Sequence, residues 1–258
     1  MTLLAGRRGV ILGVSSENSI GYQVARTLRG LGASIALTCR PARVERVAPL
    51  ASALDASLHA VDVDDEPSLA RAFETLGQDG QRLDFLVHSL VHVPEGVLGR
   101  SLLEVRRRDF EHVLSVSAWS LVAACRHARP LLMRSPAPRV VALTSACGHR
   151  MTPHYHVAGI AKAALESAVL YLAMQLGREG ILVNAVGSSL MATDGAVRAV
   201  GEQNAAATRS VQAKRSATGR AVEFEEIAGS VAFLCSPLCR NVTGEIVTVD
   251  GGFARSYL

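Results

Sequence analysis

The feature that most constrains the fold of this 258-residue chain is a regular alternation of short apolar segments with longer amphipathic ones. The short segments are rich in Val, Ile and Leu and are typical of buried β-strands, whereas the longer ones repeat apolar residues at helical spacing. We expect strands at residues 8–13, 33–39, 58–63, 83–91, 139–145, 181–187 and 245–252, with helices between them, including further helix at 101–133. Strands that alternate with helices form a parallel sheet covered on both faces. The sequence therefore predicts an α/β fold, a Rossmann-type doubly wound sheet of seven parallel strands flanked by helices.

The chain is expected to form a single domain over residues 1–258, because no Pro/Ser-rich linker divides it and no repeat is visible. Its 49% hydrophobic and 19% charged content is typical of a soluble globular protein. No apolar run approaches the roughly 20 residues of a membrane span, and the N-terminus lacks the long apolar core of a signal peptide. We expect a cytoplasmic protein.

Two kinds of site are excluded by composition and spacing. The five cysteines have no CxxC spacing, and Cys235 and Cys239 have no nearby His to complete a zinc site, so no metal is expected. Aromatic residues make up only 4% of the chain and no recognised nucleic-acid module is present, so nucleic acid is not an expected partner.

A phosphate-binding loop is expected between the first strand and the first helix, at residues 8–21. A strand, a loop of small residues and a helix N-terminus place backbone N–H groups and the helix dipole where they attract anions. The loop is not a GxGxxG motif, since Gly13 is followed by five residues and then by Ser19 and Ile20. We take Gly13, Ser19 and Ile20 as candidate residues for binding a nucleotide phosphate.

Residues at the ends of the next three strands indicate which nucleotide is bound. Arg40 follows the second strand, with Arg43 close behind, where NAD-preferring Rossmann proteins usually carry an acidic residue. A guanidinium at this place matches the 2′-phosphate of NADP. Asp62 and Val63, after the third strand, are candidates for contact with adenine, and Ser89, after the fourth, would line the crevice. We expect NADPH as the cofactor, with NADH as a possible second.

The segment from Ser145 to Lys162 carries the candidate reactive groups: a hydroxyl at Ser145, a phenol at Tyr155 and an amine at Lys162. Seven helical residues turn about 700°, roughly 20° short of two full turns, so Tyr155 and Lys162 share one helix face without touching. They suit two parts of one elongated ligand. Lys162 and Lys214 are the only lysines beside 25 arginines, which hints at a role for a compact ammonium at Lys162.

A long polar segment at 188–222, rich in Ala, Gly, Ser and Arg, interrupts the alternation after the sixth strand. Segments of this kind at the carboxyl end of a doubly wound sheet often cover a ligand. We expect residues 188–222 to form a lid over the substrate.

Several motifs and two spacings carry a resemblance that runs nearly end to end. The motifs include LVHSL, VNAV and VTVDGGF, and the spacings are the five-residue loop before Ser19 and the six residues between Tyr155 and Lys162. The chain resembles the short-chain dehydrogenases/reductases, and within them the enoyl-acyl-carrier-protein reductases, to which both spacings are specific. Other members of the superfamily place the tyrosine four residues before the lysine, where this chain has Ala158.

The resemblance implies a role for each matching position. Ser19 and Ile20 would contact the pyrophosphate, and Asp62 and Val63 the adenine. Two residues after the sixth strand, Met191 and Thr193, would contact the nicotinamide carboxamide and the pyrophosphate. Lys162 would hold the nicotinamide ribose, and Tyr155 would donate a hydrogen bond to the substrate carbonyl oxygen.

The implied reaction is NADPH-dependent reduction of the 2,3 double bond of an enoyl thioester, carried by acyl carrier protein or coenzyme A, in fatty-acid or related biosynthesis. Tyr155 would stabilise the enolate oxygen, while the charge of Lys162 favours an ionised phenol. A cluster of basic residues in the lid (Arg209, Lys214, Arg215, Arg220) suits an acidic carrier protein as partner. Family members are commonly homotetramers.

Two departures from the family pattern bear on the substrate. Many enoyl reductases have a second tyrosine ten residues before the first, where this chain has Ser145, and carbonyl-reducing relatives keep a catalytic serine there. The Gly-Pro that usually follows the sixth strand is replaced by Ser189 and Leu190. A ketoreductase of secondary metabolism is therefore the alternative. A non-catalytic NADP-binding protein is a third, against which the retained Tyr155 and Lys162 argue.

Overall fold

The computed structural model, which describes residues 2–256, confirms the predicted sheet of seven parallel strands. The strand order is β3-β2-β1-β4-β5-β6-β7, so the order reverses between β1 and β4. Ligands of doubly wound folds bind at the carboxyl ends of the strands beside this reversal. The strands are β1 (Arg8–Leu12), β2 (Ser34–Cys39), β3 (Ser57–Ala60), β4 (Phe85–His88), β5 (Arg139–Ser145), β6 (Leu182–Ser188) and β7 (Ile246–Val249).

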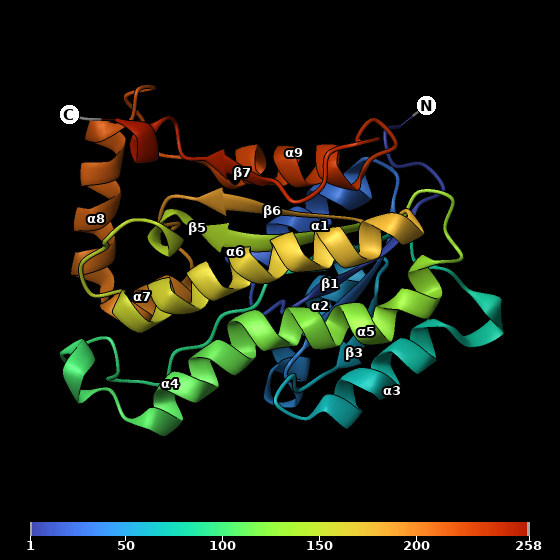
Figure 1. The fold of residues 1–258 in the computed structure, drawn as a ribbon, viewed down its shortest axis with the longest axis horizontal. Coiled ribbons are helices and arrows are strands. Elements are labelled where there is room, and N and C mark those ends of the chain that lie inside the picture. Colours follow the sequence, from blue (N-terminus) through green and yellow to red (C-terminus); the bar gives the residue numbers. More distant parts are fainter. Residues whose placement is uncertain (1, 257–258) are drawn as a thin grey trace.

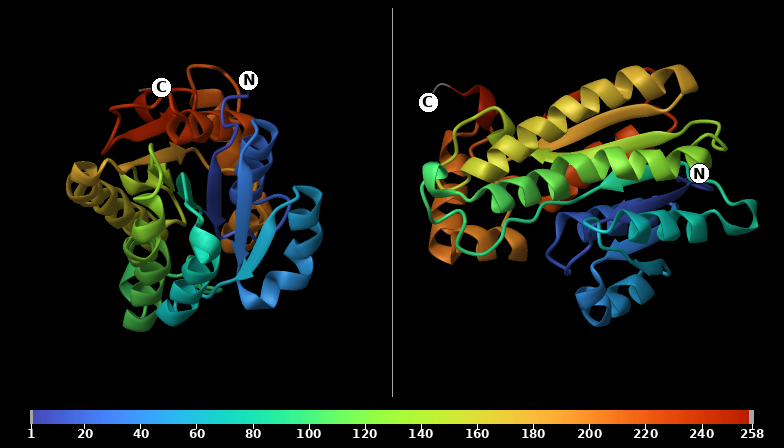
Figure 2. Two further views of the ribbon diagram at one scale, coloured as in Figure 1. Left: turned by 90° about the vertical axis from the view of Figure 1, so that its right-hand side faces the viewer. Right: turned by 60° about the horizontal axis from the view of Figure 1, so that its bottom comes forward.

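Helices cover both faces of the sheet (Figures 1 and 2). One apolar core lies under α1 (Ile20–Gly30), α2 (Val44–Ala53) and α9 (Phe224–Cys235). A second core lies under α3 (Glu66–Leu76), α5 (Ser120–Leu132) and α6 (His156–Leu176). Adjacent strand residues point to opposite faces and contribute to different cores, as Val10 and Ile11 of β1 do, which is why the strands are apolar without a break.

The helical region expected at 101–133 is not one continuous helix. It consists of a 3₁₀ turn (Leu102–Glu104), α4 (Arg107–Leu114), a π-helical turn (Ser115–Trp119) and α5. Within the wider turn, Ser120 hydrogen-bonds both to the carbonyl of Val116 and to His88 of the sheet. The apolar repeat predicted the helices correctly. It could not predict the hydrogen bond between Ser120 and the buried His88, because His88 belongs to a distant strand.

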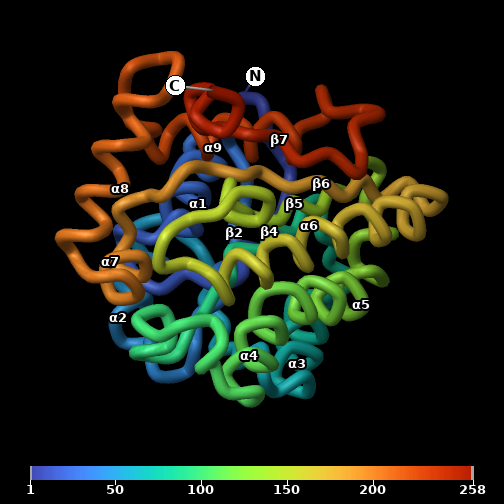
Figure 3. Tube along the Cα trace, turned by 60° about the vertical axis from the view of Figure 1, so that its left-hand side comes forward, coloured from blue at the N-terminus to red at the C-terminus, as the bar shows by residue number. Residues whose placement is uncertain are grey.

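The 188–222 segment folds into two helices, α7 (Asp194–Val200) and α8 (Glu202–Arg215), which lie at the end of the molecule where α6 begins (Figures 1 and 3). An ion pair of 2.6 Å joins Arg46 of α2 to Asp194 of α7. The backbone N–H of Leu190 donates to the side-chain oxygen of Gln212 on α8, at 3.1 Å. The two contacts attach both helices to the carboxyl edge of the sheet.

One helical stretch, His156–Glu179, is long and apolar enough to cross a membrane by length and composition. Half of its apolar stretch is buried inside the molecule, where α6 packs on β5 and β6. The burial on the sheet accounts for its apolar composition as that of a core helix.

Candidate active site

The phosphate loop is built by a left-handed glycine and a capped helix. Gly13 has φ +93°, and a Cβ there would come within 2.4 Å of the backbone oxygen of Ser89, so only glycine fits. Ser19 is the N-cap of α1: its Oγ accepts from the N–H of Tyr22 and donates to the carbonyl of Ser16. Within residues 2–256, no acceptor is found for the backbone N–H groups of Ile20 and Gly21. These donors at a helix N-terminus fit a pyrophosphate.

The residues predicted to bind the adenosine half lie at the carboxyl ends of β2, β3 and β4. Arg40 follows β2, and its guanidinium makes no ion pair or hydrogen bond with the described part of the chain. The Asp62 carboxylate accepts from the backbone N–H of Asp64 at 3.2 Å, and Val63 is buried. Ser89 donates its backbone N–H to Leu12, and its Oγ lies over Gly21. The sheet therefore gathers these four at one edge, although they come from three separate segments.

Lys162 is a buried ammonium, with its side chain directed back toward the sheet. The residue is 5% exposed, and its Nζ donates to the carbonyls of Leu143 (2.8 Å) and Leu90 (3.3 Å). Burial lowers its pKa to about 8, while Cys147 and Glu166 oppose that shift. An ammonium has three N–H donors, and the third has no acceptor among the described residues. That donor is available to a ligand hydroxyl.

Tyr155 is the N-cap of α6 and is partly buried against a small apolar cluster, to which Phe110 and Leu114, and Ala199 and Val200 of α7, also belong. Its hydroxyl has no hydrogen-bond partner in the part of the chain that the structure describes. Burial, and secondarily Cys147, raises the pKa of the phenol well above its usual value. Burial thus opposes the ionised phenol that the charge of Lys162 is expected to favour. Tyr155 is a protonated donor.

Ser145 is the last residue of β5 and pairs with Ser188 of β6 in the sheet. Its Oγ hydrogen-bonds the Sγ of Cys147, a residue of the following 3₁₀ turn, Ala146–Gly148. Burial raises the pKa of the Cys147 thiol, so the thiol is neutral. The Ser145 hydroxyl is thus held by a neighbour within its own loop.

The residues after β6 lead from the sheet into the lid helices. Met191 is buried and belongs to the core under α1 and α9. Thr193 caps α7 by accepting a hydrogen bond from the N–H of Ala196, at 3.0 Å. The side chains of the two predicted cofactor contacts therefore have different surroundings. The Thr193 hydroxyl caps the N-terminus of α7, whereas the Met191 side chain packs in an apolar core.

Three polar residues that the sequence analysis missed form a hydrogen-bonded chain near Arg40. The Nδ1 of His92 lies 2.7 Å from the Nε2 of His112, and the Nδ1 of His112 lies 3.3 Å from Asp64. Burial, together with the charges of Arg40, His112 and Arg198, lowers the pKa of His92 to about 4, and Asp64 opposes the shift. Asp64 and His92 each follow a strand end, which is the signal that could have identified them. Nothing in the spacing predicts His112.

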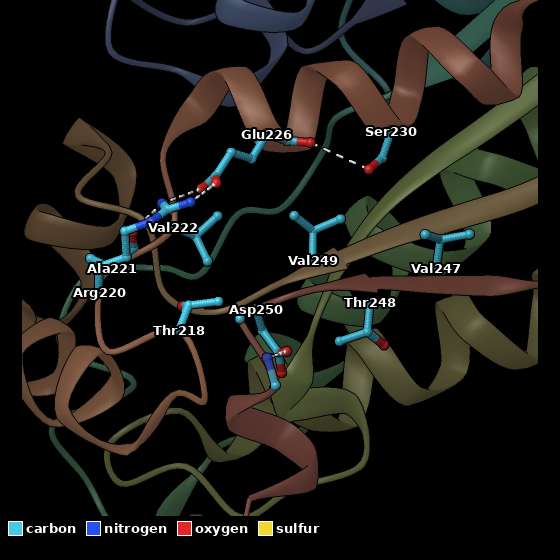
Figure 4. Close-up of a pocket in the computed structure, with 12 residues that line it drawn as sticks. Thr218, Arg220, Ala221, Val222, Glu226, Ser230, Val247, Thr248, Val249 and Asp250 are labelled. Carbon is cyan, nitrogen blue, oxygen red and sulfur yellow. Dashed lines mark hydrogen bonds and ion pairs between the residues drawn. The ribbon is translucent and has the colours of Figure 1, made fainter.

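A hollow of about 360 Å³ lies between β7 and the start of α9 (Figure 4). The Arg220–Glu226 ion pair and the side chains of Ser230 and Asp250 line it. It contains none of the predicted catalytic or cofactor residues. The candidate active site is therefore defined by the strand ends and the α1 and α6 N-termini, not by this hollow.

Comparison with known proteins gives consistent matches over the whole chain. The family described as enoyl-(acyl carrier protein) reductase matches residues 13–254. The chain is 35% identical to enoyl-[acyl-carrier-protein] reductase [NADH] FabI of Neisseria meningitidis, over 100% of this chain and 98% of that protein. It is 34% identical to enoyl-[acyl-carrier-protein] reductase [NADH] 2 of Rhizobium meliloti, over 97% and 92%.

Solved structures agree with the sequence matches. The enoyl-[acyl-carrier-protein] reductase (NADH) of Aquifex aeolicus superimposes with a TM-score of 0.93 at 30% identity, covering 99% of both chains. The Bacillus cereus enoyl-acyl carrier protein reductase, solved with NADP⁺ and indole naphthyridinone, also has a TM-score of 0.93, at 32% identity over 100% of both chains.

Proposed function

The chain belongs to the enoyl-acyl-carrier-protein reductase family of the short-chain dehydrogenases/reductases, and from this membership we propose that it reduces the 2,3 double bond of an enoyl thioester in fatty-acid biosynthesis. The observation that carries the proposal is the pair of unused donors at one edge of the sheet. The Tyr155 hydroxyl and one N–H of Lys162 both lack an acceptor among residues 2–256. They lie at the N-cap and in the body of α6, with six residues between them in the chain, which suits groups that serve substrate and cofactor.

Tyr155 acts on the substrate carbonyl. When bound, the nicotinamide cofactor supplies the hydride for the β-carbon of the enoyl thioester. Negative charge then develops on the thioester oxygen, and a phenol that keeps its proton is the donor suited to stabilise it. Such a donor contributes about 3 kcal/mol where water is excluded.

Lys162 acts on the cofactor side. Its third N–H would donate to the ribose hydroxyls of the nicotinamide half, and its charge would add positive potential near the developing enolate. The Ile20 and Gly21 amides and Ser19 hold the pyrophosphate, and Asp62, Val63 and Ser89 line the adenosine side. Met191 and Thr193 complete the nicotinamide side.

The cofactor proposed for this chain is NADPH, with NADH as the weaker one. The relatives named above are called NADH-dependent, and the Bacillus cereus structure contains NADP⁺. Support for NADPH here comes from Arg40, a guanidinium without an internal partner among the described residues, at the strand end where a 2′-phosphate is bound. Its removal tests the preference.

We predict that Arg40→Asp lowers the kcat/KM ratio of NADPH to NADH by about tenfold or more, because a charge-assisted contact becomes a repulsion. The measurement is steady-state kinetics with each cofactor. Arg43→Asp, three residues further on, is the control. An unchanged ratio in the Arg40 variant would assign the cofactor preference to other residues.

The 188–222 segment is proposed as a lid over the acyl chain. Ala199 and Val200 of α7 pack in the same cluster as Tyr155, so the segment bounds the space beside the phenol. Two residues of the basic cluster predicted to bind a carrier protein form ion pairs within the chain, Arg209 with Glu223 and Arg220 with Glu226. Docking of acyl carrier protein therefore relies on Lys214, which is exposed, more than on the cluster as a whole.

A cytoplasmic homotetramer is the proposed assembly. Large apolar side chains are exposed at the two ends of α5, at Trp119 and Met133, and on α6, at Leu170, Tyr171 and Met174. Packing against further copies of the chain would bury them. Light scattering coupled to gel filtration measures the copy number.

The deciding experiment for the function is incubation with NADPH and either crotonyl or acetoacetyl thioester, followed by absorbance. Oxidation of NADPH with the crotonyl substrate is expected. Oxidation only with the acetoacetyl substrate would establish the ketoreductase that Ser145 leaves open, and oxidation with neither would favour a binding protein.

A further inference from the structure

Glu166 lies on α6, one helical turn after Lys162, and carries a largely buried carboxylate. Its side chain is 15% exposed and lies at the junction of α6 with the end of β5. The proposed function gives it no role, since it contacts neither a strand end that binds the cofactor nor Tyr155. A carboxylate in such a position needs partners, and these partners belong to the active-site loop.

The first set of contacts holds the turn that carries Ser145 and Cys147. Thr144 donates its hydroxyl to Oε1 of Glu166 at 2.7 Å, and His149 lies 3.7 Å from Oε2. A Cβ on Gly148 would come within 2.7 Å of Oε1, so the backbone of the turn rests directly on the carboxylate.

The same turn is also in close contact with the α6 backbone. A Cβ on Gly159 would come within 2.7 Å of the Cys147 carbonyl oxygen, so α6 and the turn are held close together at that point. The turn is therefore in close contact with α6 at two places: Gly159 approaches Cys147, and Glu166 approaches Gly148.

The second set of interactions is electrostatic and concerns Lys162. Its two hydrogen-bond acceptors are neutral backbone carbonyls, and no ion pair to Lys162 occurs in the described residues. Burial disfavours its charged form, whereas Glu166 and Cys147 favour that form. Since burial keeps the Cys147 thiol neutral, Glu166 supplies the negative charge.

We infer that Glu166 is a positioning residue of the active site, which fixes the Ser145 turn through Thr144 and Gly148 and places its carboxylate on the same side of α6 as the Lys162 ammonium, one helical turn away. The inference rests on the proposed function only in giving Lys162 a catalytic use for its charge. The two effects of Glu166 are separable, because one depends on a hydrogen bond and the other on a charge.

Two variants separate them. Glu166→Gln keeps an oxygen that accepts from Thr144 but removes the charge, whereas Thr144→Val keeps the charge and removes the hydrogen bond. Glu166→Asp restores the charge on a shorter side chain. Circular-dichroism melting of all three establishes that each is folded before the comparison.

The first readout is the titration of Lys162 in protein without substrate. Because the chain has two lysines, protein labelled with ¹³Cε-lysine gives two resonances, and the exposed Lys214 is an internal control. In Glu166→Gln we expect the Lys162 midpoint to fall by about one pH unit while Lys214 is unchanged. Thr144→Val and Glu166→Asp are expected to keep the wild-type midpoint. An unchanged Lys162 midpoint in Glu166→Gln would overturn the inference.

The second readout is the pH profile of enoyl reduction. Glu166→Gln is expected to move the alkaline limb of kcat to lower pH by the same amount, whereas Thr144→Val lowers kcat about threefold or more at every pH without moving the limb. A purely structural Glu166 would lower activity equally at all pH values, which would also overturn the inference. If the titration shifts but no thioester is reduced, the proposed function fails and the effect of Glu166 on Lys162 stands.

Discussion

At the scale of single residues, the roles proposed for Tyr155 and Lys162 depend on a donor that each keeps free of the protein. Elsewhere in the molecule, buried donors are mostly used, as the Thr144 hydroxyl is by Glu166. The Tyr155 hydroxyl lies in an apolar cluster that offers it no acceptor, and burial raises its pKa. A donor without a partner inside the protein can bond a ligand oxygen without the loss of an intramolecular hydrogen bond.

Tyr155→Phe is therefore expected to lower kcat about 100-fold or more, since it removes one preorganised donor to the developing oxyanion. The midpoint of thermal unfolding should change little, because the hydroxyl makes no hydrogen bond among the described residues. Steady-state kinetics and thermal melting on the same preparation test both statements. A large loss of stability with normal kcat would show that the hydroxyl serves the fold.

At the scale of elements, the site depends on how closely the Ala146–Gly148 turn approaches α6. The helix carries Tyr155 at its start and Lys162 two turns on, and the turn carries Cys147 beside Ser145. Gly159 lets the two backbones meet, because any Cβ would come within 2.7 Å of the Cys147 carbonyl. The position of Ser145 relative to Lys162 thus depends on Gly159, although Gly159 contacts the reactive atom of neither residue.

We expect Gly159→Ala to destabilise the fold by about 1–3 kcal/mol and to lower kcat, because the carbonyl it would strike is backbone and has little freedom to move. Gly177→Ala is the matched control: it lies at the end of the same helix with φ −60° and open space around the new methyl. Urea unfolding of both variants measures the difference. Equal stability of the two variants would contradict the predicted close approach.

At the scale of the whole molecule, the central strand of the parallel sheet contains a buried histidine. His88 of β4 is fully buried, and its Nε2 hydrogen-bonds Ser120 at 2.7 Å. Burial, aided by the charge of Lys162, lowers its pKa to about 3. The unfolded chain binds a proton at this residue near pH 6.5 and the folded one does not, so stability from His88 is present above pH 6.5 and is lost as the pH falls from there toward 3.

The free energy of unfolding is expected to fall by roughly 2 kcal/mol from this residue between pH 7 and pH 5. His88→Gln keeps an N–H donor to the Ser120 hydroxyl, whose own proton goes to the Val116 carbonyl, and should flatten that part of the dependence, whereas exposed His154→Gln should not. Urea titrations at the two pH values provide the comparison. Parallel pH dependences for wild type and His88→Gln would show that His88 is protonated in the folded state.

The sequence by itself determined three things: the layers of helix and sheet, the doubly wound parallel fold, and the family. The alternation of apolar strands and helices is a local property, and a parallel sheet covered on both faces is its consequence. The spacing between Tyr155 and Lys162 and the loop before Ser19 are equally local, because each lies within one helix or one strand–loop–helix unit. These features need no knowledge of which segments meet.

Only the tertiary structure decided the state of the reactive groups. The protonated Tyr155, the Lys162 ammonium bonded to Leu90 and Leu143, and the carboxylate of Glu166 beneath Gly148 all depend on neighbours from other segments. Desolvation and hydrogen bonding act over a few ångströms in space, whereas the sequence orders residues only along the chain. The helical period identified which residues share a face of α6, and the packing of β5 and β6 against that helix gave each of them its chemistry.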